Sequence, residues 1–243
     1  MENDLLNRFI PVLYLHPKEL TSPISVDDYI NNCELCVGGK KKRIQNNPWK
    51  KPIIVRENKN ILLSKGKVKL PLPNRFRIIP KTYLDYQGKY NLPNKTNIDL
   101  IPIYGKVEYY QDFIDIIYIF NYYYNNAYKW LGIYVGGEHQ ADIEHIRIRV
   151  SKINNIYEVS KIYFSAHSKD QGRWVKSKNI EWYNNIPNKR PIVYVAKGSH
   201  ANYPSSGIWF RVFGFANDKT KKKGAIKWNP KNIINLNERD DLM

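Results

Sequence analysis

Short runs of alternating apolar and polar residues predict β-strands along most of this chain. The clearest run covers residues 142–150, where apolar and mostly β-branched side chains recur at every second position. Turn-forming residues separate the other runs, so two β-hairpins are predicted, at 101–124 and at 143–165. Residues 192–197 are apolar on both faces, which is typical of a central strand.

This pattern favours an all-β fold, a β-sandwich with long loops and one short N-terminal helix. The helix is predicted to follow Ser25, a good N-cap, and to keep its apolar spacing through Cys33. Residues 9–15 predict the first strand. A chain of 243 residues suits one such domain, so 1–243 is expected to form it, with a basic loop or insertion around 38–51 and a polar, loosely held tail from about 231.

The strand at 142–150 carries two carboxylates on its apolar face. Alternation places Asp142 and Glu144 on the side of the following isoleucines, while His145 points the other way. Carboxylates that face a core need compensation. A divalent cation would supply it, with His139 as a third ligand, and arginine or backbone N–H groups are the alternative. The oxygen-rich set favours Mg²⁺, Ca²⁺ or Mn²⁺, while the one histidine leaves Zn²⁺ open.

Two further histidines lie where strands end. A simple register in the 143–165 hairpin returns Ser165 and His167 to the entrance of the carboxylate strand. The strand at 192–197 ends in a Gly-Ser-His-Ala loop that delivers Ser199 and His200. These last two are not themselves a catalytic pair, because adjacent side chains diverge, but His200 and His167 are candidate acid–base groups.

The net charge of +17 favours phosphate-bearing partners, either nucleic acid or an acidic membrane surface. The charge is spread out, however, and its only runs, 40–43 and 221–223, are also compatible with solvated loops. Abundant Lys, Asn, Ile and Tyr fit an AT-rich genome equally well, such as that of some protists or large DNA viruses. A lone Cys33-x-x-Cys36 lacks the second pair of a zinc site and predicts two reduced structural thiols.

No run approaches the ~20 apolar residues that span a bilayer, and the first residues lack the features of a secretory signal. The sequence therefore predicts an intracellular protein, either cytoplasmic or peripheral to a membrane. A virion protein is the expectation if the source is a large DNA virus.

Several motifs resemble those of the vacuolar protein sorting-associated protein 62 family. They comprise Gly137-Glu138-His139 with Asp142-Ile143-Glu144-His145, Tyr163-Phe164-Ser165-Ala166-His167, and residues 193–204. Residues 11–19 and 214–220 resemble the opening and closing segments of that family, which adds His16 and Asp218 to Ser199 as binding candidates. The His139-x-x-Asp142-x-Glu144 core is also similar to the metal-holding motif of necrosis-inducing toxin-like proteins, which are β-sandwiches that bind a divalent ion next to a membrane glycolipid.

Both resemblances imply a divalent-metal-dependent binding module for an anionic lipid headgroup or a glycan. In that case His139, Asp142 and Glu144 hold the ion. The rival hypothesis is a metal-dependent hydrolase, such as a phosphoesterase, in which the ion activates water and His200 or His167 acts as acid or base. A third hypothesis, a basic nucleic-acid-associated or structural protein, depends on the charge alone.

Overall fold

The computed structural model describes residues 2–31, 33–37, 82–86, 98–126, 128–130, 133–136, 139–153, 156–167, 171–187, 189–211 and 217–238. Strands dominate these residues, which confirms the all-β prediction. Their helices are α1 (Glu2–Phe9) and α2 (Val26–Asn31), with the short 3-10 helices η2 (Ile98–Leu100), η3 (Ser177–Asn179), η4 (Tyr183–Asn185) and η6 (Leu236–Glu238). The described part of the chain contains no helix with the length and apolar character needed to cross a membrane.

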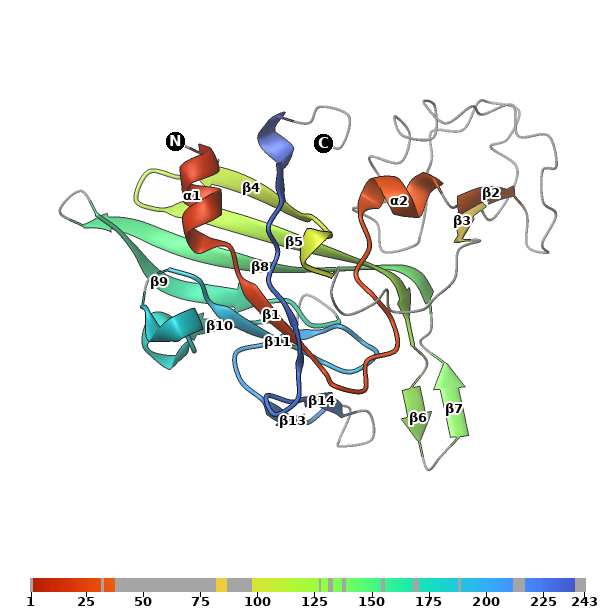
Figure 1. Cartoon of the computed structure of the whole chain (residues 1–243). Coiled ribbons are helices and arrows are strands. Elements are labelled where there is room, and N and C mark those ends of the chain that lie inside the picture. The colour runs from red at the N-terminus through yellow and green to blue at the C-terminus, as the bar shows by residue number, and fades with distance from the viewer. Residues whose placement is uncertain are drawn as a thin grey trace.

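The larger sheet has six strands in the order β10-β9-β8-β5-β4-β16 (Figure 1). Their bounds are β4 (Ile103–Tyr109), β5 (Ile114–Asn125), β8 (His139–Ile153), β9 (Ile156–Phe164), β10 (Arg173–Lys176) and β16 (Ile233–Asn235). Neighbours are antiparallel, except that β16 runs parallel to β4. The β4–β5 and β8–β9 pairs confirm both predicted hairpins.

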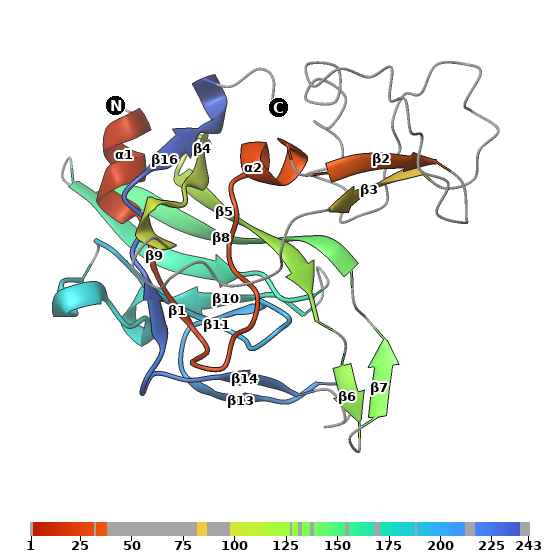
Figure 2. The ribbon, with the colours of Figure 1, turned by 45° about the vertical axis from the view of Figure 1, so that its right-hand side comes forward.

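The smaller sheet has four strands in the order β12-β11-β1-β15. Their bounds are β1 (Val12–Leu15), β11 (Ile192–Val195), β12 (Asn202–Tyr203) and β15 (Ile226–Trp228). Parallel β1 and β11 form the centre, and all four residues of β11 are buried, as its apolar sequence predicted. This sheet packs across the larger one to complete the sandwich (Figure 2).

Three two-stranded pairs extend from the sandwich. They are β2 (Cys33–Val37) with β3 (Thr82–Tyr86), β6 (Tyr128–Trp130) with β7 (Ile133–Gly136), and β13 (Gly207–Trp209) with β14 (Asp218–Thr220). All three pairs are antiparallel. In Figures 1 and 2 the β13–β14 and β6–β7 pairs lie at the lower end of the molecule.

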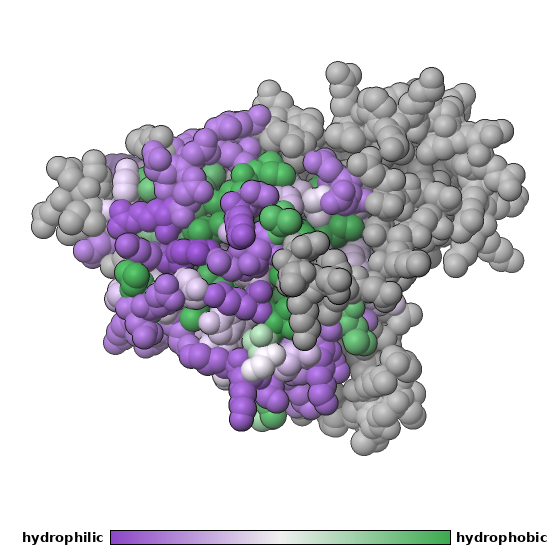
Figure 3. All heavy atoms as spheres, in the orientation of Figure 1, coloured by the Kyte–Doolittle hydropathy of each residue, from purple (hydrophilic) through white to green (hydrophobic). Residues whose placement is uncertain are grey.

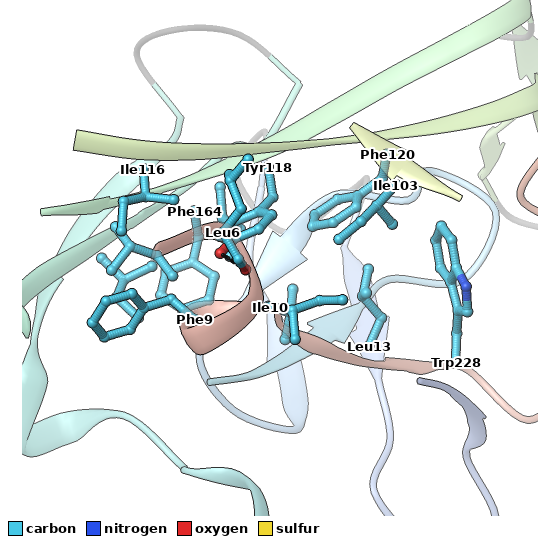
Figure 4. Packing of buried hydrophobic residues seen from close by; sticks show 14 of the residues in the cluster. Leu6, Phe9, Ile10, Leu13, Ile103, Ile116, Tyr118, Phe120, Phe164 and Trp228 are labelled. Atoms are coloured by element: carbon cyan, nitrogen blue, oxygen red, sulfur yellow. Dashed lines mark hydrogen bonds between the residues drawn. The ribbon is translucent and has the colours of Figure 1, made fainter. Parts of the chain in front are cut away.

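The core fills the space between the two sheets. Leu13 of β1 and Trp228 of β15 face Phe120 of β5, and all three side chains are buried (Figure 4). The Phe120 and Trp228 rings meet edge to face at 6.1 Å. Burial of large apolar side chains on both facing layers is the main stabilising contribution to such a sandwich.

Helix α1 was missed by the sequence analysis, which assigned residues 9–15 to one strand. Instead, Phe9 ends α1 and the strand begins at Val12, after Pro11. The helical signal was the spacing of Leu5, Leu6 and Phe9, all of which are buried. A Cβ on Gly105 of β4 would lie 2.5 Å from Leu6, so this glycine allows α1 to lie directly on the sheet.

Helix α2 confirms the helix predicted after Ser25. The Ser25 hydroxyl accepts a hydrogen bond from the Asp28 N–H at 3.0 Å and donates one to the Asp28 carboxylate at 2.6 Å, which together form a capping interaction. The predicted length was wrong, because Cys33 lies in β2 and not in the helix. The basic segment 38–51 lies outside the described residues.

The expected loose tail from about 231 is also corrected. Residues 233–235 form β16 and extend the larger sheet, and Leu236 is buried. The Asn237 side chain donates to the Val107 carbonyl at 3.1 Å. Apolar residues within this otherwise polar segment explain why it pairs with β4 and does not remain loose.

Candidate functional site

The start of β8 carries both predicted carboxylates into the interior. Asp142 is 3% exposed and Glu144 is 1% exposed, while the intervening Ile143 is only partly buried. The neighbouring strand β5 places Tyr122 opposite Asp142 and Phe120 opposite Glu144. The predicted assignment of the two faces of this strand is therefore confirmed.

His200 reaches these carboxylates from the turn that follows β11. The turn is tight, since Gly198 and His200 both have left-handed backbones, with φ angles of 75° and 52°. The imidazole is fully buried and stacks on the Tyr122 ring at 4.0 Å and 6°. Its Nδ1 lies 2.9 Å from Asp142 Oδ2. A loop histidine thus meets the first carboxylate of β8.

The loop after β1 supplies a third buried carboxylate, Glu19. Its Oε1 accepts hydrogen bonds from the Leu20 N–H at 2.9 Å and from the Thr21 hydroxyl at 2.9 Å. Its Oε2 accepts from the Gly198 N–H at 2.7 Å. Glu19 therefore joins its own loop to the turn that carries His200, whose Nε2 lies 3.7 Å from Glu19 Oε1.

These contacts define the protonation state of His200. The Thr21 hydroxyl donates to Glu19, so it accepts from His200 Nε2 at 2.7 Å, while Nδ1 faces the carboxylate of Asp142. Both ring nitrogens are then donors, and the ring is an imidazolium. Burial by itself would lower the pKa of His200, but Asp142 and Glu19 outweigh it and raise the pKa to about 9.

The pKa of Glu19 moves in the opposite direction. Burial by itself would raise it, but His200 and the N–H groups of Gly198 and Thr21 lower the pKa from 4.5 to about 2. Glu19 and His200 are therefore both charged at neutral pH.

Glu144 is held by the second strand of the β8–β9 hairpin. The Ser165 hydroxyl donates to Glu144 Oε2 and accepts from the His145 N–H at 2.9 Å. The side-chain amide of Asn202, from β12, also donates to this hydroxyl at 3.3 Å. The predicted return of Ser165 to the carboxylate strand is confirmed.

A second polar cluster surrounds Asp218 on β14. Its carboxylate accepts hydrogen bonds from Ser199 at 2.8 Å, Tyr203 at 2.6 Å and His167 Nε2 at 2.5 Å. Burial by itself would raise the pKa of Asp218, but His167 and the two hydroxyl groups lower it. Three of the predicted site residues therefore meet here, and the Gly198–His200 turn joins this cluster to the first one.

The remaining predicted residues have different positions. His16 accepts a hydrogen bond at Nδ1 from the Lys18 N–H at 3.1 Å, and its carbonyl accepts from the Glu19 N–H at 2.8 Å, so it shapes the loop that positions Glu19. His145 lies on the opposite face of β8, with its ring 5.7 Å from that of Tyr163. His139 opens β8, but its side chain lies outside the described part of the structure.

The first cluster is rich in carboxylates. It contains three buried ones, Glu19, Asp142 and Glu144, and the imidazolium of His200 lies against Asp142 and Glu19. Among the side chains that the structure describes, no three His, Cys, Asp or Glu gather closely enough to hold a metal ion. Two of the three predicted ligands, Asp142 and Glu144, fit an oxygen-preferring divalent cation through their shared face and charge.

A buried hydroxyl next to these charges lacks a partner within the described residues. The Tyr122 side chain is fully buried, and its oxygen has no hydrogen-bond partner there. Burial, followed by the charges of Asp142, Glu144 and Glu19, raises the pKa of Tyr122 well above its usual value, so the phenol stays protonated. None of the described residues provides the hydrogen bond that a buried hydroxyl normally makes.

Sequence analysis missed several members of both clusters: Glu19, Thr21, Tyr122, Asn202 and Tyr203. The alternation that placed Asp142 could have found Tyr122, since the two are paired across β5 and β8. No local pattern distinguishes Glu19 or Thr21, which come from a loop more than a hundred residues away from both carboxylates of β8.

Comparison with known families supports the motif resemblance. The sequence profile described as "Vacuolar protein sorting-associated protein 62" matches residues 100–231, which include β8, the His200 turn and Asp218. No curated protein matches the chain.

Solved structures with a similar fold include Necrosis and Ethylene inducing Protein 2 from the causal agent of cocoa's Witches Broom disease. Its identity is 12% and its TM-score 0.45, over 98% of this chain and 76% of that one. The non-toxic HaNLP3 protein has 11% identity and a TM-score of 0.43, over 96% and 74% of the two chains. NLPPya in complex with mannosamine has 10% identity and a TM-score of 0.47, over 99% and 77%.

Proposed function

The chain belongs to the vacuolar protein sorting-associated protein 62 family, and we propose that it is a divalent-metal-dependent binding module for an anionic lipid headgroup or a glycan. Asp142 and Glu144 hold the ion, with His139 as the third ligand. The observation that carries the proposal is the burial of two carboxylates, Asp142 and Glu144, on one face at the start of β8. Buried carboxylates are costly unless charges or hydrogen bonds compensate them, and a divalent cation is one source of such compensation.

The ligand class follows from the chemistry of such an ion. Carboxylate oxygens favour Mg²⁺, Ca²⁺ or Mn²⁺, which take six or more ligands and therefore leave positions for oxygens from outside the protein. Phosphate and sugar hydroxyl groups supply such oxygens. The Tyr122 hydroxyl, buried beside Asp142, supports a further polar group at this place.

The geometry favours a binding role over hydrolysis. A general base needs a free lone pair, but both nitrogens of His200 are engaged and its pKa of about 9 keeps it protonated at neutral pH. Ser199 and His167 both form hydrogen bonds to the carboxylate of Asp218, which therefore lies between them. In this arrangement His167 does not activate the Ser199 hydroxyl. His200 is therefore not arranged as a general base, and His167 is not paired with Ser199.

The test replaces each proposed ligand with its amide. Asp142→Asn and Glu144→Gln keep the side-chain shape but remove a charge, so the rise in melting temperature on adding Mg²⁺, Ca²⁺ or Mn²⁺ should be lost in both. Metal analysis of the purified parent should find a divalent ion, and neither variant should retain it.

Arg147→Gln is the matched control, because Arg147 lies on the same strand but on its opposite face. It should keep the full response to metal. A parent that contains no ion and is not stabilised by any of the three cations would overturn the proposal.

A further inference from the structure

One end of the molecule combines exposed apolar side chains with lysines. Among the large apolar side chains of the described residues, the three most exposed are Phe210 at 79%, Leu20 at 67% and Ile208 at 57%. Leu20 lies in the loop after β1, Ile208 lies in the β13–β14 pair, and Phe210 directly follows β13. In Figures 1 and 2 that loop and this pair lie side by side at the lower end.

Hydrogen bonds hold these segments together. The Lys197 N–H donates to the Lys219 carbonyl at 3.0 Å, which connects the end of β11 to β14. The Gly198 N–H donates to the Glu19 carboxylate at 2.7 Å, which connects the turn after β11 to the loop that carries Leu20. Ile208 lies directly across from Lys219 in the β13–β14 pair. We call this surface the loop face, formed by Lys18, Leu20, Lys197, Ile208, Phe210, Lys219 and Lys221.

The apolar residues of the loop face point away from the protein. Trp209 turns inward and stacks on Tyr203 at 4.4 Å, whereas Ile208 and Phe210 on either side of it are exposed. Each of these three side chains remains in water until another surface buries it.

The exposed charges of the loop face are positive. Lys18, Lys197, Lys219 and Lys221 are exposed, whereas the two acidic residues of the same segments, Glu19 and Asp218, are buried at 3% exposure each. Burial lowers the pKa of His16, and the charges of Lys197, Lys221 and Lys18 lower it further against the opposite effect of Glu19, so three of these lysines act on the same histidine. In Figure 3 hydrophilic residues cover most of the lower edge, with a small apolar area among them.

We propose that the loop face binds the surface of an anionic lipid bilayer, with Leu20, Ile208 and Phe210 entering the boundary between headgroups and acyl chains. The lysines around them contact the acidic headgroups. Aliphatic side chains gain by leaving water but do not stack on bases, so Leu20 and Ile208 favour a bilayer over a nucleic acid. The proposal deepens the proposed function by naming its partner, yet it uses neither the metal nor its ligands.

The experiment measures sedimentation of the full chain with phosphatidylcholine vesicles, with and without phosphatidylserine, in the presence of EDTA. The parent should sediment with the acidic vesicles only, and added salt should weaken binding. The double variant Ile208→Ser and Phe210→Ser should bind about tenfold more weakly or worse. Lys219→Gln with Lys221→Gln should also reduce binding.

Leu100→Ser is the matched control, because Leu100 is 56% exposed but lies in η2, outside the loop face. It should bind like the parent. In a Phe210→Trp variant, brominated acyl chains should quench the added fluorescence, which reports insertion directly. EDTA keeps the assay independent of the proposed metal, so either proposal can fail without the other.

Three outcomes would overturn the proposal. Equal sedimentation with neutral and acidic vesicles, or none with either, would exclude an acidic bilayer as the partner of the loop face. Tight binding to single-stranded DNA that needs the same lysines, without vesicle binding, assigns the face to nucleic acid. A dimer that the double serine variant abolishes, again without vesicle binding, assigns it to a second copy of the chain.

Discussion

The two faces of β8 both carry charged side chains, but they balance them in different ways. On the outer face, Arg149 donates two hydrogen bonds to the buried carboxylate of Asp115, at 2.8 and 2.9 Å, and Arg147 adds a third at 3.2 Å. Asp115 and Arg149 are direct partners on adjacent strands. Arg149 also lies over the Phe113 ring at 3.7 Å. Neighbouring strands alone supply this balance.

On the inner face, the balance comes from distant segments of the chain. Asp142 meets His200, which comes from the turn after β11, and His200 in turn faces Glu19 from the loop after β1. A guanidinium is charged at every ordinary pH, whereas an imidazolium persists only while its neighbours raise its pKa. The inner face is therefore balanced only in the folded protein, while the outer face uses permanent charges.

The largest expected effect is that of His200→Ala. The variant leaves Asp142 and Glu19 buried without their cation, which should lower the free energy of unfolding by about 3–5 kcal/mol. Urea unfolding at neutral pH measures this loss. A loss below about 1 kcal/mol would mean that the imidazolium does not balance this face.

Glu19→Gln should have the next largest effect, and that effect should depend on pH. The folded pKa of Glu19 is lowered from 4.5 to about 2, so its charge stabilises the fold above pH 4.5 and stops doing so as the pH falls through about 2. The shift corresponds to about 3 kcal/mol at neutral pH. Unfolding of parent and variant, compared between pH 7 and pH 2, should show this difference vanish in acid. A difference that persists at pH 2 would assign the role of Glu19 to its shape and not to its charge.

Arg149→Gln should have the smallest effect. The variant loses two hydrogen bonds to Asp115, but Arg147 remains 3.2 Å from the same carboxylate, and the arginine is partly exposed at 25%. We expect a loss of about 1–2 kcal/mol in the same urea experiment. A loss equal to that of His200→Ala would remove the distinction between the two faces.

The sequence predicts only part of the inner face, and the reason is physical. Alternation along β8 assigns Asp142 and Glu144 to this face, and hairpin pairing brings Ser165 beside Glu144, because both follow from local geometry. The contact between His200 and Asp142 does not follow from local geometry, because it depends on how the turn after β11, far along the chain, folds. Charge compensation was predicted, and one source of it is His200, which the sequence analysis did not name as a partner of Asp142.

The fold could also be predicted where local sequence pattern determines the structure, and not where distant contacts do. The β-like runs of the two hairpins gave β4, β5, β8 and β9 at nearly their observed positions, and the run that is apolar on both faces gave β11. Helix α1 and strand β16 were missed, because both are short and are stabilised by packing against β4 more than by their own sequence. Tertiary contacts determine the secondary structure of such short segments.

The parallel pairing of β16 with β4 has a consequence for synthesis on the ribosome. The Asn237 side chain that binds the Val107 carbonyl lies 130 residues later in the chain. Until that segment emerges, β4 is the edge strand of the larger sheet, with unpaired N–H and C=O groups along one side. The nascent protein therefore exposes an open strand from the time β4 and β5 have paired until β16 is synthesised, and pairing of this edge with another nascent chain is the misfolding route that competes with closure by β16.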